Sequence, residues 1–158
     1  IHKEETTIET IASKITTEML SKGFKPNTLV TMNGKRYCSL KEVSDAFKHM
    51  INVVQRHLYG RHSKQKIKFL AIAEKNEANQ SHFHALFDIP LIEENRYMLE
   101  FLQTWTVLDK GSSIGLSNDT LTARDTWFKQ VYEVEGVVKY LFKNHRNAEK
   151  YEFVGMVL

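Results

Sequence analysis

The fold is decided by two apolar runs, Ile67-Lys68-Phe69-Leu70-Ala71-Ile72-Ala73-Glu74 and His82-Phe83-His84-Ala85-Leu86-Phe87-Asp88-Ile89. The polar segment 75–81 joins them, and Pro90 ends the second run. Short apolar runs of this length, separated by a polar turn, are typical of two paired strands. We therefore expect a β-hairpin over residues 67–89.

Helices and further strands are expected on both sides of this hairpin. Apolar residues recur at helical spacing over 7–21 and again from Leu40 to Leu58, after the capping box Ser39-Leu40-Lys41-Glu42 and before Gly60. The other expected elements are a strand at 28–32 with a turn at Asn33-Gly34 and a short return strand, a helix at 93–103, a strand at 127–132, a helix at 134–146 and a strand at 151–158. This order of elements is compatible with an α+β fold.

Size and composition indicate one globular domain. The chain has 158 residues, of which 42% are hydrophobic and 26% are charged. No apolar run reaches the length of about 20 residues that a membrane helix needs, and no secretory signal begins the sequence, so we expect a soluble, intracellular protein. Cys38 is the only cysteine, which excludes an intrachain disulfide and a cysteine-based zinc site. We expect residues 1–158 to be a single domain, and the first residue, Ile1, is consistent with excision from a longer protein.

A basic segment lies in the middle of the sequence. No Asp or Glu occurs between Ala46 and Ala73, although the net charge of the whole chain is only +3. The cations of this basic segment are Lys48, Arg56, Arg61, Lys64, Lys66 and Lys68. Such a run is usually a solvated surface. The alternative is an electrostatic footprint for the phosphates of a nucleic acid.

A histidine pair in the second apolar run is the first candidate for chemistry. Residues two apart in a strand share a face, so His82 and His84 point to one side and Phe83 to the other. Glu74 ends the preceding strand, and a hairpin can bring its carboxylate beside both rings. Two imidazoles and a carboxylate are a ligand set for a divalent cation, in which imidazole favours manganese or zinc over magnesium. The alternative is that Glu74 simply ends a strand at the surface.

Tyr140 and Lys143 are the second candidate. On the expected helix over 134–146 they are three residues apart and therefore neighbours on one face. A cation beside a phenol favours the phenolate, the form that a tyrosine nucleophile uses. Taken alone, such a pair is more often a core aromatic beside a lysine whose stem covers apolar surface.

Together these residues resemble the motifs of the HUH single-strand DNA endonucleases, specifically of the single-tyrosine replication initiators (Rep type). His82-Phe83-His84 matches the family's His-hydrophobic-His motif, and Glu74 stands eight residues before the first histidine, as in the viral branch. Val137, Tyr140 and Lys143 match the pattern Val-x-x-Tyr-x-x-Lys.

The order of the motifs indicates a branch of this family. Tyr140 follows the histidines, as in initiators and single-strand transposases, whereas conjugative relaxases place the tyrosine first. The positions four residues before and after it are Gly136 and Asn144, so the resemblance implies a single-tyrosine enzyme. Small transposases often take a glutamine of the tyrosine helix as third metal ligand, and Glu74 favours initiators instead. The strand at 29–32 is a looser match to the first family motif.

The resemblance implies a fold and a chemistry. The fold is α+β, an RRM-like central antiparallel sheet of about five strands flanked by helices. Glu74, His82 and His84 would hold Mn²⁺ or Mg²⁺, and Tyr140 would attack a phosphodiester of single-stranded DNA, leaving a 5′-phosphotyrosine and a free 3′-hydroxyl. Lys143 would assist near the tyrosine, and Lys139 more weakly. Nicking and joining of this kind initiate rolling-circle replication.

The implied partner is single-stranded DNA from an origin or an element end, including a hairpin. The basic segment and a Gly- and Ser-rich loop at 110–119 would contact it, an attached or separate helicase is a compatible partner, and no membrane is involved. The implied location is the bacterial cytoplasm or, for a viral protein, the host nucleus. Two alternatives stay open: a single-strand transposase with the same chemistry, and a non-catalytic domain that binds single-stranded nucleic acid.

Overall fold

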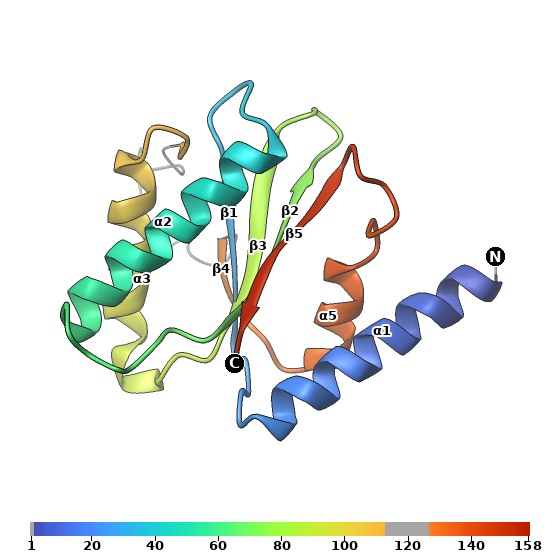
Figure 1. Ribbon diagram of the computed structural model, residues 1–158, viewed down its shortest axis with the longest axis horizontal. Coiled ribbons are helices and arrows are strands. Elements are labelled where there is room, and N and C mark those ends of the chain that lie inside the picture. Colours follow the sequence, from blue (N-terminus) through green and yellow to red (C-terminus); the bar gives the residue numbers. More distant parts are fainter. Residues whose placement is uncertain (1, 113–126) are drawn as a thin grey trace.

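The computed structural model describes residues 2–112 and 127–158, which form an α+β fold around one antiparallel sheet (Figure 1). The sheet has five strands in the order β4-β1-β3-β2-β5. The strands are β1 (Thr28–Asn33), β2 (Phe69–Lys75), β3 (Ser81–Phe87), β4 (Phe128–Gln130) and β5 (Tyr151–Val157). The expected fold class, the five-stranded antiparallel sheet and the hairpin of β2 and β3 are therefore confirmed.

Helices cover both faces of the sheet (Figure 1). The helices are α1 (His2–Ser21), α2 (Leu40–Tyr59), α3 (Glu94–Val107) after the 3-10 turn η1 (Leu91–Glu93), and α5 (Val134–Leu141). The helices α2 and α3 pack on one face, and α1 and α5 pack on the other. Among the described residues, no helix has both the length and the apolar composition needed to cross a membrane.

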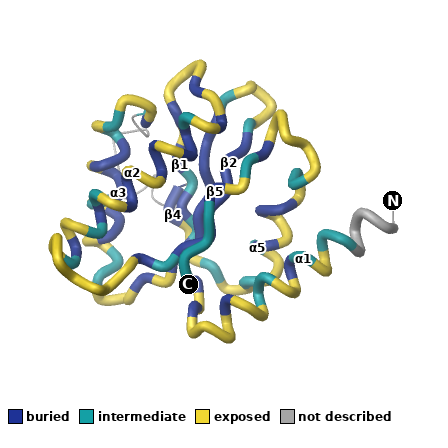
Figure 2. Tube along the Cα trace, viewed as in Figure 1, coloured by how far each residue is buried: buried dark blue, intermediate teal, exposed yellow. Residues whose placement is uncertain are grey.

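The alternation of β3 divides its side chains between these two layers. Phe83, Ala85 and Phe87 belong to the core under α2 and α3, whereas Leu86 belongs to the core under α1 and α5. His82 and His84 share the face of Leu86 because side chains of a strand alternate with a period of two. Figure 2 shows that the central strands are buried. The histidine pair therefore lies inside the molecule, beneath the layer of α1 and α5.

The helix α2 begins at the capping box expected from the sequence. The Oγ of Ser39 accepts a hydrogen bond from the backbone N–H of Glu42 at 3.1 Å, and the Glu42 carboxylate accepts one from the N–H of Ser39 at 3.2 Å. The helix ends at Gly60, whose φ of 85° is the left-handed conformation that glycine adopts without strain. Its apolar stripe is buried against the sheet, as its spacing predicts.

The predicted return strand after Asn33-Gly34 does not form among the described residues. The Gly34 N–H donates instead to the carbonyl of Ser81 at 2.8 Å, and Gly34 forms an isolated antiparallel bridge with Gly111. A Cβ on Gly34 would lie 2.6 Å from a methyl carbon of Val43. This glycine is therefore needed for a close approach to α2 and β3 and not for a tight hairpin.

The helix predicted over 134–146 was too long, because α5 ends at Leu141. The chain continues in turns, in which the N–H of Lys143 donates to the carbonyl of Tyr140 at 3.3 Å. Both the backbone N–H and the ring Nδ1 of His145 bind the carbonyl of Phe142, at 3.1 Å and 2.8 Å. The N–H of Lys143 thus bonds to the residue three positions back and not four, so the α-helical ladder has already ended and Lys143 lies in a turn beyond the helix.

Replacing Phe83 by Ala should destabilise the fold strongly. Phe83 is fully buried, and its ring centroid lies 4.8 Å from that of Phe47 and 4.9 Å from that of Trp105. We expect the free energy of unfolding, measured by urea denaturation, to fall by about 3–5 kcal/mol. In the control Ile92→Ala, a side chain that is 96% exposed is removed, and we expect a change of at most about 0.5 kcal/mol. Equal effects of the two changes would contradict this assignment of the core.

Candidate functional site

Three ligand-type side chains meet on the face of the sheet that α1 and α5 cover. Glu74 of β2 is paired directly with His82 of β3, and His84 follows two residues later on the same face. The Oε1 atom of Glu74 lies 3.1 Å from Nε2 of His82 and 2.9 Å from Nε2 of His84, and the two Nε2 atoms are 3.1 Å apart. All three residues are buried. We call Glu74, His82 and His84 the ligand cluster.

The protonation states favoured for Glu74 and His84 suit the binding of a cation. Burial by itself raises the pKa of the Glu74 carboxyl, but hydrogen bonds from His82 and His84 and the positive charge of Lys143 together outweigh burial and hold that pKa well below its usual range. Burial also lowers the pKa of His84, although its contact with Glu74 opposes the change. An ionised carboxylate and a neutral imidazole are the forms that bind metals.

Protons cannot satisfy all three contacts of the ligand cluster at once. A neutral imidazole carries one N–H, and an ionised carboxylate only accepts. If both Nε2 atoms donate to the same oxygen of Glu74, the contact of 3.1 Å between the two nitrogens has two donors and no acceptor. If one Nε2 atom is unprotonated, its lone pair faces the carboxylate oxygen. A cation shared by the three lone pairs removes this conflict, so the residues present fit a bound metal ion.

The spacing of the ligand atoms also fits a divalent metal with six ligands. Ligands about 2.1 Å from a cation and at right angles to one another lie about 3.0 Å apart, whereas tetrahedral ligands at that distance lie about 3.4 Å apart. The three separations of 2.9 Å, 3.1 Å and 3.1 Å agree with the shorter value. The spacing is therefore compatible with one cation that is shared by the three atoms.

Thr31 of β1 orients one of the histidines, and the sequence analysis did not single it out. Its Oγ1 atom lies 2.7 Å from Nδ1 of His84, opposite the nitrogen that faces Glu74. A hydrogen bond at the second nitrogen fixes the ring and its tautomer, as around most metal-bound histidines. The signal for Thr31 is its direct pairing with His84 between β1 and β3, which requires the strand register and cannot be obtained from a motif.

Tyr140 and Lys143 lie beside the ligand cluster. The ring centroid of Tyr140 is 5.8 Å from that of His84, and Tyr140 is 49% exposed. The Nζ of Lys143 lies 3.7 Å from the Tyr140 ring centroid and 3.2 Å from each carboxylate oxygen of Glu74. Lys143 therefore joins the tyrosine to the cluster, and it does so from a turn and not from the helix on which it was expected.

The other cations named from the sequence lie away from this cluster. Lys139 forms an exposed ion pair with Glu9 of α1, with 3.1 Å between Nζ and Oε1. Lys68 immediately precedes β2 and lies six positions before Glu74, a separation of about 20 Å along a strand. The remaining cations of the basic segment, Lys48, Arg56, Arg61, Lys64 and Lys66, belong to α2, which packs on the opposite face, or to the loop that follows it. Their contact with DNA stays a prediction.

The loop expected at 110–119 is described only at its start. Lys110 forms an ion pair with Glu42, with 3.0 Å between Nζ and Oε2, and Gly111 bridges to Gly34. Residues 113–119 lie outside the described residues, so the expected contact of this loop with DNA stays a prediction.

Comparison with known proteins adds no family to this geometry. No family model, no curated protein and no solved structure matches the chain. The function is therefore argued from the ligand cluster and its neighbours.

Removing the hydroxyl of Thr31 should weaken metal binding without removing a ligand. In Thr31→Val the shape of the side chain is kept and its hydrogen bond to His84 is lost. We expect the affinity for Mn²⁺, measured by isothermal titration calorimetry, to fall by about 10- to 100-fold. Thr31→Ser keeps the hydroxyl and is expected to retain most of the affinity. Equal Mn²⁺ affinities of the wild type and Thr31→Val would refute the positioning role.

Proposed function

We propose that this chain is a metal-dependent endonuclease that nicks and joins single-stranded DNA through a covalent tyrosine intermediate. One observation carries the proposal: a buried Glu-His-His cluster with metal-ligand spacing lies beside a half-exposed tyrosine, and one lysine contacts both. Each part alone has ordinary structural explanations. Their combination is what a phosphoryl-transfer site with a protein nucleophile requires.

The ligand cluster would hold the cation. Glu74, His82 and His84 supply one oxygen and two nitrogens, a set that suits Mn²⁺ and accepts Mg²⁺. When bound, the cation supplies Lewis-acid polarisation of a phosphate oxygen. Thr31 keeps the Nε2 atom of His84 directed at the cluster by binding the other ring nitrogen.

Tyr140 is the proposed nucleophile. Its oxygen forms a bond to the phosphorus of the scissile phosphodiester, and the bond from phosphorus to the 3′-oxygen breaks. The phenol proton passes to solvent, and the leaving 3′-oxygen takes up a proton to become a 3′-hydroxyl. The 5′-phosphate stays on the tyrosine, so a 3′-hydroxyl of the same or a second strand can attack it and restore a phosphodiester. Nicking and joining are then one reaction in two directions.

Lys143 would act on both partners of this reaction. Its ammonium lies over the Tyr140 ring, a cation–π contact, and it neutralises part of the charge of Glu74. Phosphate oxygens that approach the ligand cluster would also meet the ammonium of Lys143. Lys143 is therefore proposed as an electrostatic group of the reaction, and the Lys139–Glu9 ion pair gives Lys139 a weaker part at most.

The biological role proposed with this chemistry is initiation of rolling-circle replication. Its partner would be single-stranded origin DNA, with a helicase attached or separate, in the bacterial cytoplasm or the host nucleus of a virus. A single-strand transposase would use the same site. A non-catalytic nucleic-acid binding domain is the alternative of another class, and it gives no reason for a tyrosine and a lysine to lie beside the ligand cluster.

Tyr140→Phe should abolish covalent attachment to DNA. We expect the wild type to give a protein–DNA adduct on a denaturing gel with labelled single-stranded oligonucleotides of randomised sequence and Mn²⁺, and to give none with EDTA. Tyr140→Phe should give no adduct under either condition, because it lacks the attacking oxygen. Tyr132→Phe is the matched control, since Tyr132 is 86% exposed, and its adduct should equal that of the wild type.

Two results of this experiment would overturn the proposal. An adduct that persists in Tyr140→Phe would assign the nucleophile to another residue. Tight binding of the oligonucleotides with no adduct in Mn²⁺ or Mg²⁺ would favour the binding domain instead.

Lys143→Ala should change metal binding and chemistry in opposite directions. The ammonium of Lys143 pairs with the same carboxylate that would hold the cation, and it repels a second positive charge. We expect its removal to tighten Mn²⁺ binding roughly tenfold and to slow adduct formation by about tenfold or more. Titration calorimetry measures the first effect, and the time course of adduct formation at saturating Mn²⁺ measures the second. A parallel loss of both would indicate that Lys143 only holds the local structure together.

A further inference from the structure

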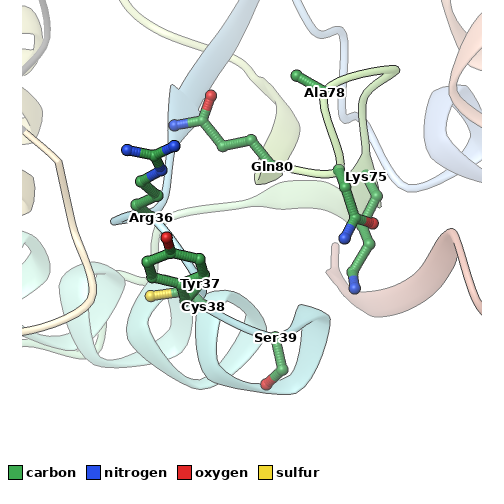
Figure 3. Close-up of a pocket in the computed structure, with 8 residues that line it drawn as sticks. Arg36, Tyr37, Cys38, Ser39, Lys75, Ala78 and Gln80 are labelled. Carbon is green, nitrogen blue, oxygen red and sulfur yellow. The ribbon is translucent and has the colours of Figure 1, made fainter.

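A polar pocket of 620 Å³ lies at the same end of the sheet as the ligand cluster, and the proposed chemistry does not use it. Its walls come from residues 36–39 after β1, from Lys75 at the end of β2 and from residues 78–80 of the loop between β2 and β3 (Figure 3). A volume of this size is in the range of sites for small ligands. We call it the end pocket.

Tyr37 is the unusual residue of the end pocket. It is 90% exposed, and its φ of 74° places a bulky residue in the left-handed region, which costs on the order of 1–3 kcal/mol. The guanidinium of Arg36 lies 5.5 Å from the centroid of its ring. A strained backbone thus presents a flat aromatic face to solvent beside a cation, which is the arrangement that stacks on a nucleic-acid base.

The other residues of the end pocket supply positive charge and side-chain amides. Arg36 and Lys75 are its cations, and no Asp or Glu is present among the described residues that line it. The Nε2 of Gln80 donates a hydrogen bond to the carbonyl of Gly34 at 3.2 Å, which fixes the orientation of the amide. Asn79 adds a second amide. Such a surface attracts phosphate and offers hydrogen bonds to the edge of a base.

The end pocket is close to the ligand cluster along the chain. Lys75 directly follows Glu74, and Gln80 precedes His82 by two residues, a span of about 7 Å in a strand. Successive side chains leave a strand on opposite faces, so Lys75 and Glu74 lie on the two sides of the sheet. A polymer bound at both places would therefore cross the end of the sheet between the cluster and the pocket.

We propose that the end pocket binds a nucleotide that flanks the cleaved phosphate in the same single strand of DNA. The base stacks on Tyr37, the amide of Gln80 meets its edge, and Arg36 and Lys75 pair with the neighbouring phosphates. This inference rests on the proposed function, because it takes its ligand from that reaction. It goes further by naming where the strand is held and which residues hold it.

The substitution Tyr37→Gly tests the proposal without weakening the fold. Glycine adopts φ near 74° without strain and the Tyr37 side chain buries little surface, so the thermal midpoint should stay unchanged or rise. We expect the affinity for a fluorescein-labelled oligothymidylate, measured by anisotropy, to fall by about fivefold or more, the loss typical of one stacked base. The binding measurements use the Tyr140→Phe background, in which no covalent step interferes.

Three matched controls isolate the contributions of the aromatic ring and of the positive charge to binding. Tyr37→Phe keeps the stacking face and should bind the oligothymidylate as the parent does, and Tyr132→Gly removes an exposed tyrosine at the opposite end of the sheet and should have no effect. Lys75→Ala should weaken binding and reduce its salt dependence, whereas Lys25→Ala, before β1, should do neither.

The outcomes separate this inference from the proposed function. Unchanged affinity in both Tyr37→Gly and Lys75→Ala, with an adduct that still requires Tyr140, would overturn the end pocket and leave the proposed function standing. Failure of the Tyr140→Phe protein to bind oligothymidylate or the randomised oligonucleotides would overturn both. Weaker binding in Tyr37→Gly at an unchanged thermal midpoint, with normal binding in Tyr37→Phe, would establish the pocket.

Discussion

Burial of Phe83 is the constraint on which the candidate site depends. Its ring packs between Phe47 and Trp105 under α2 and α3, so the residues on either side of it must point to the other face. A slip of one residue in β3 would place both imidazoles in the apolar core under α2 and α3 and move the phenyl ring to the face that α1 and α5 cover. Packing on one face of the sheet therefore maintains the geometry of the ligand cluster on the opposite face. This explains why the residue between His82 and His84 is hydrophobic.

The charge of Glu74 organises the polar side of the sheet. A buried carboxylate is costly unless it is paired and hydrogen-bonded. Both histidines and Lys143 contact Glu74, and Lys143 comes from a turn 69 residues away in the sequence. Because the turn after α5 is held by this contact, the same carboxylate that would bind a metal also positions the segment next to Tyr140. The proposed ligand Glu74 and the proposed nucleophile Tyr140 are thus coupled through Lys143.

Local rules of sequence were sufficient for the elements that carry the ligands. The hairpin, the shared face of His82 and His84, and the capping box at Ser39 depend only on periodicity and near neighbours, and all appear in the structure. Features set by distant contacts were not predictable in this way. Asn33-Gly34 is typical of a hairpin turn, but Gly34 instead contacts Ser81 and Gly111. The helical spacing after residue 134 continues past Leu141, where α5 ends in turns. Thr31 becomes visible only through its register with His84.

The placement of the groups is compatible with the proposed action of a rigid metal site on a polymer. The ligands lie on the two central strands, where neighbouring strands and both cores restrict their movement, as a site of defined geometry needs. Tyr140 lies instead in the last turn of the short helix α5 and is half exposed, so a phosphate can approach it from solvent. The loops at this end of the sheet follow β1 and join β2 to β3, and they adjoin the strands that hold the ligands. In the proposed reaction, a strand of DNA bound there would meet the ligand cluster, the accessible Tyr140 and the adjacent end pocket without any rearrangement of the sheet.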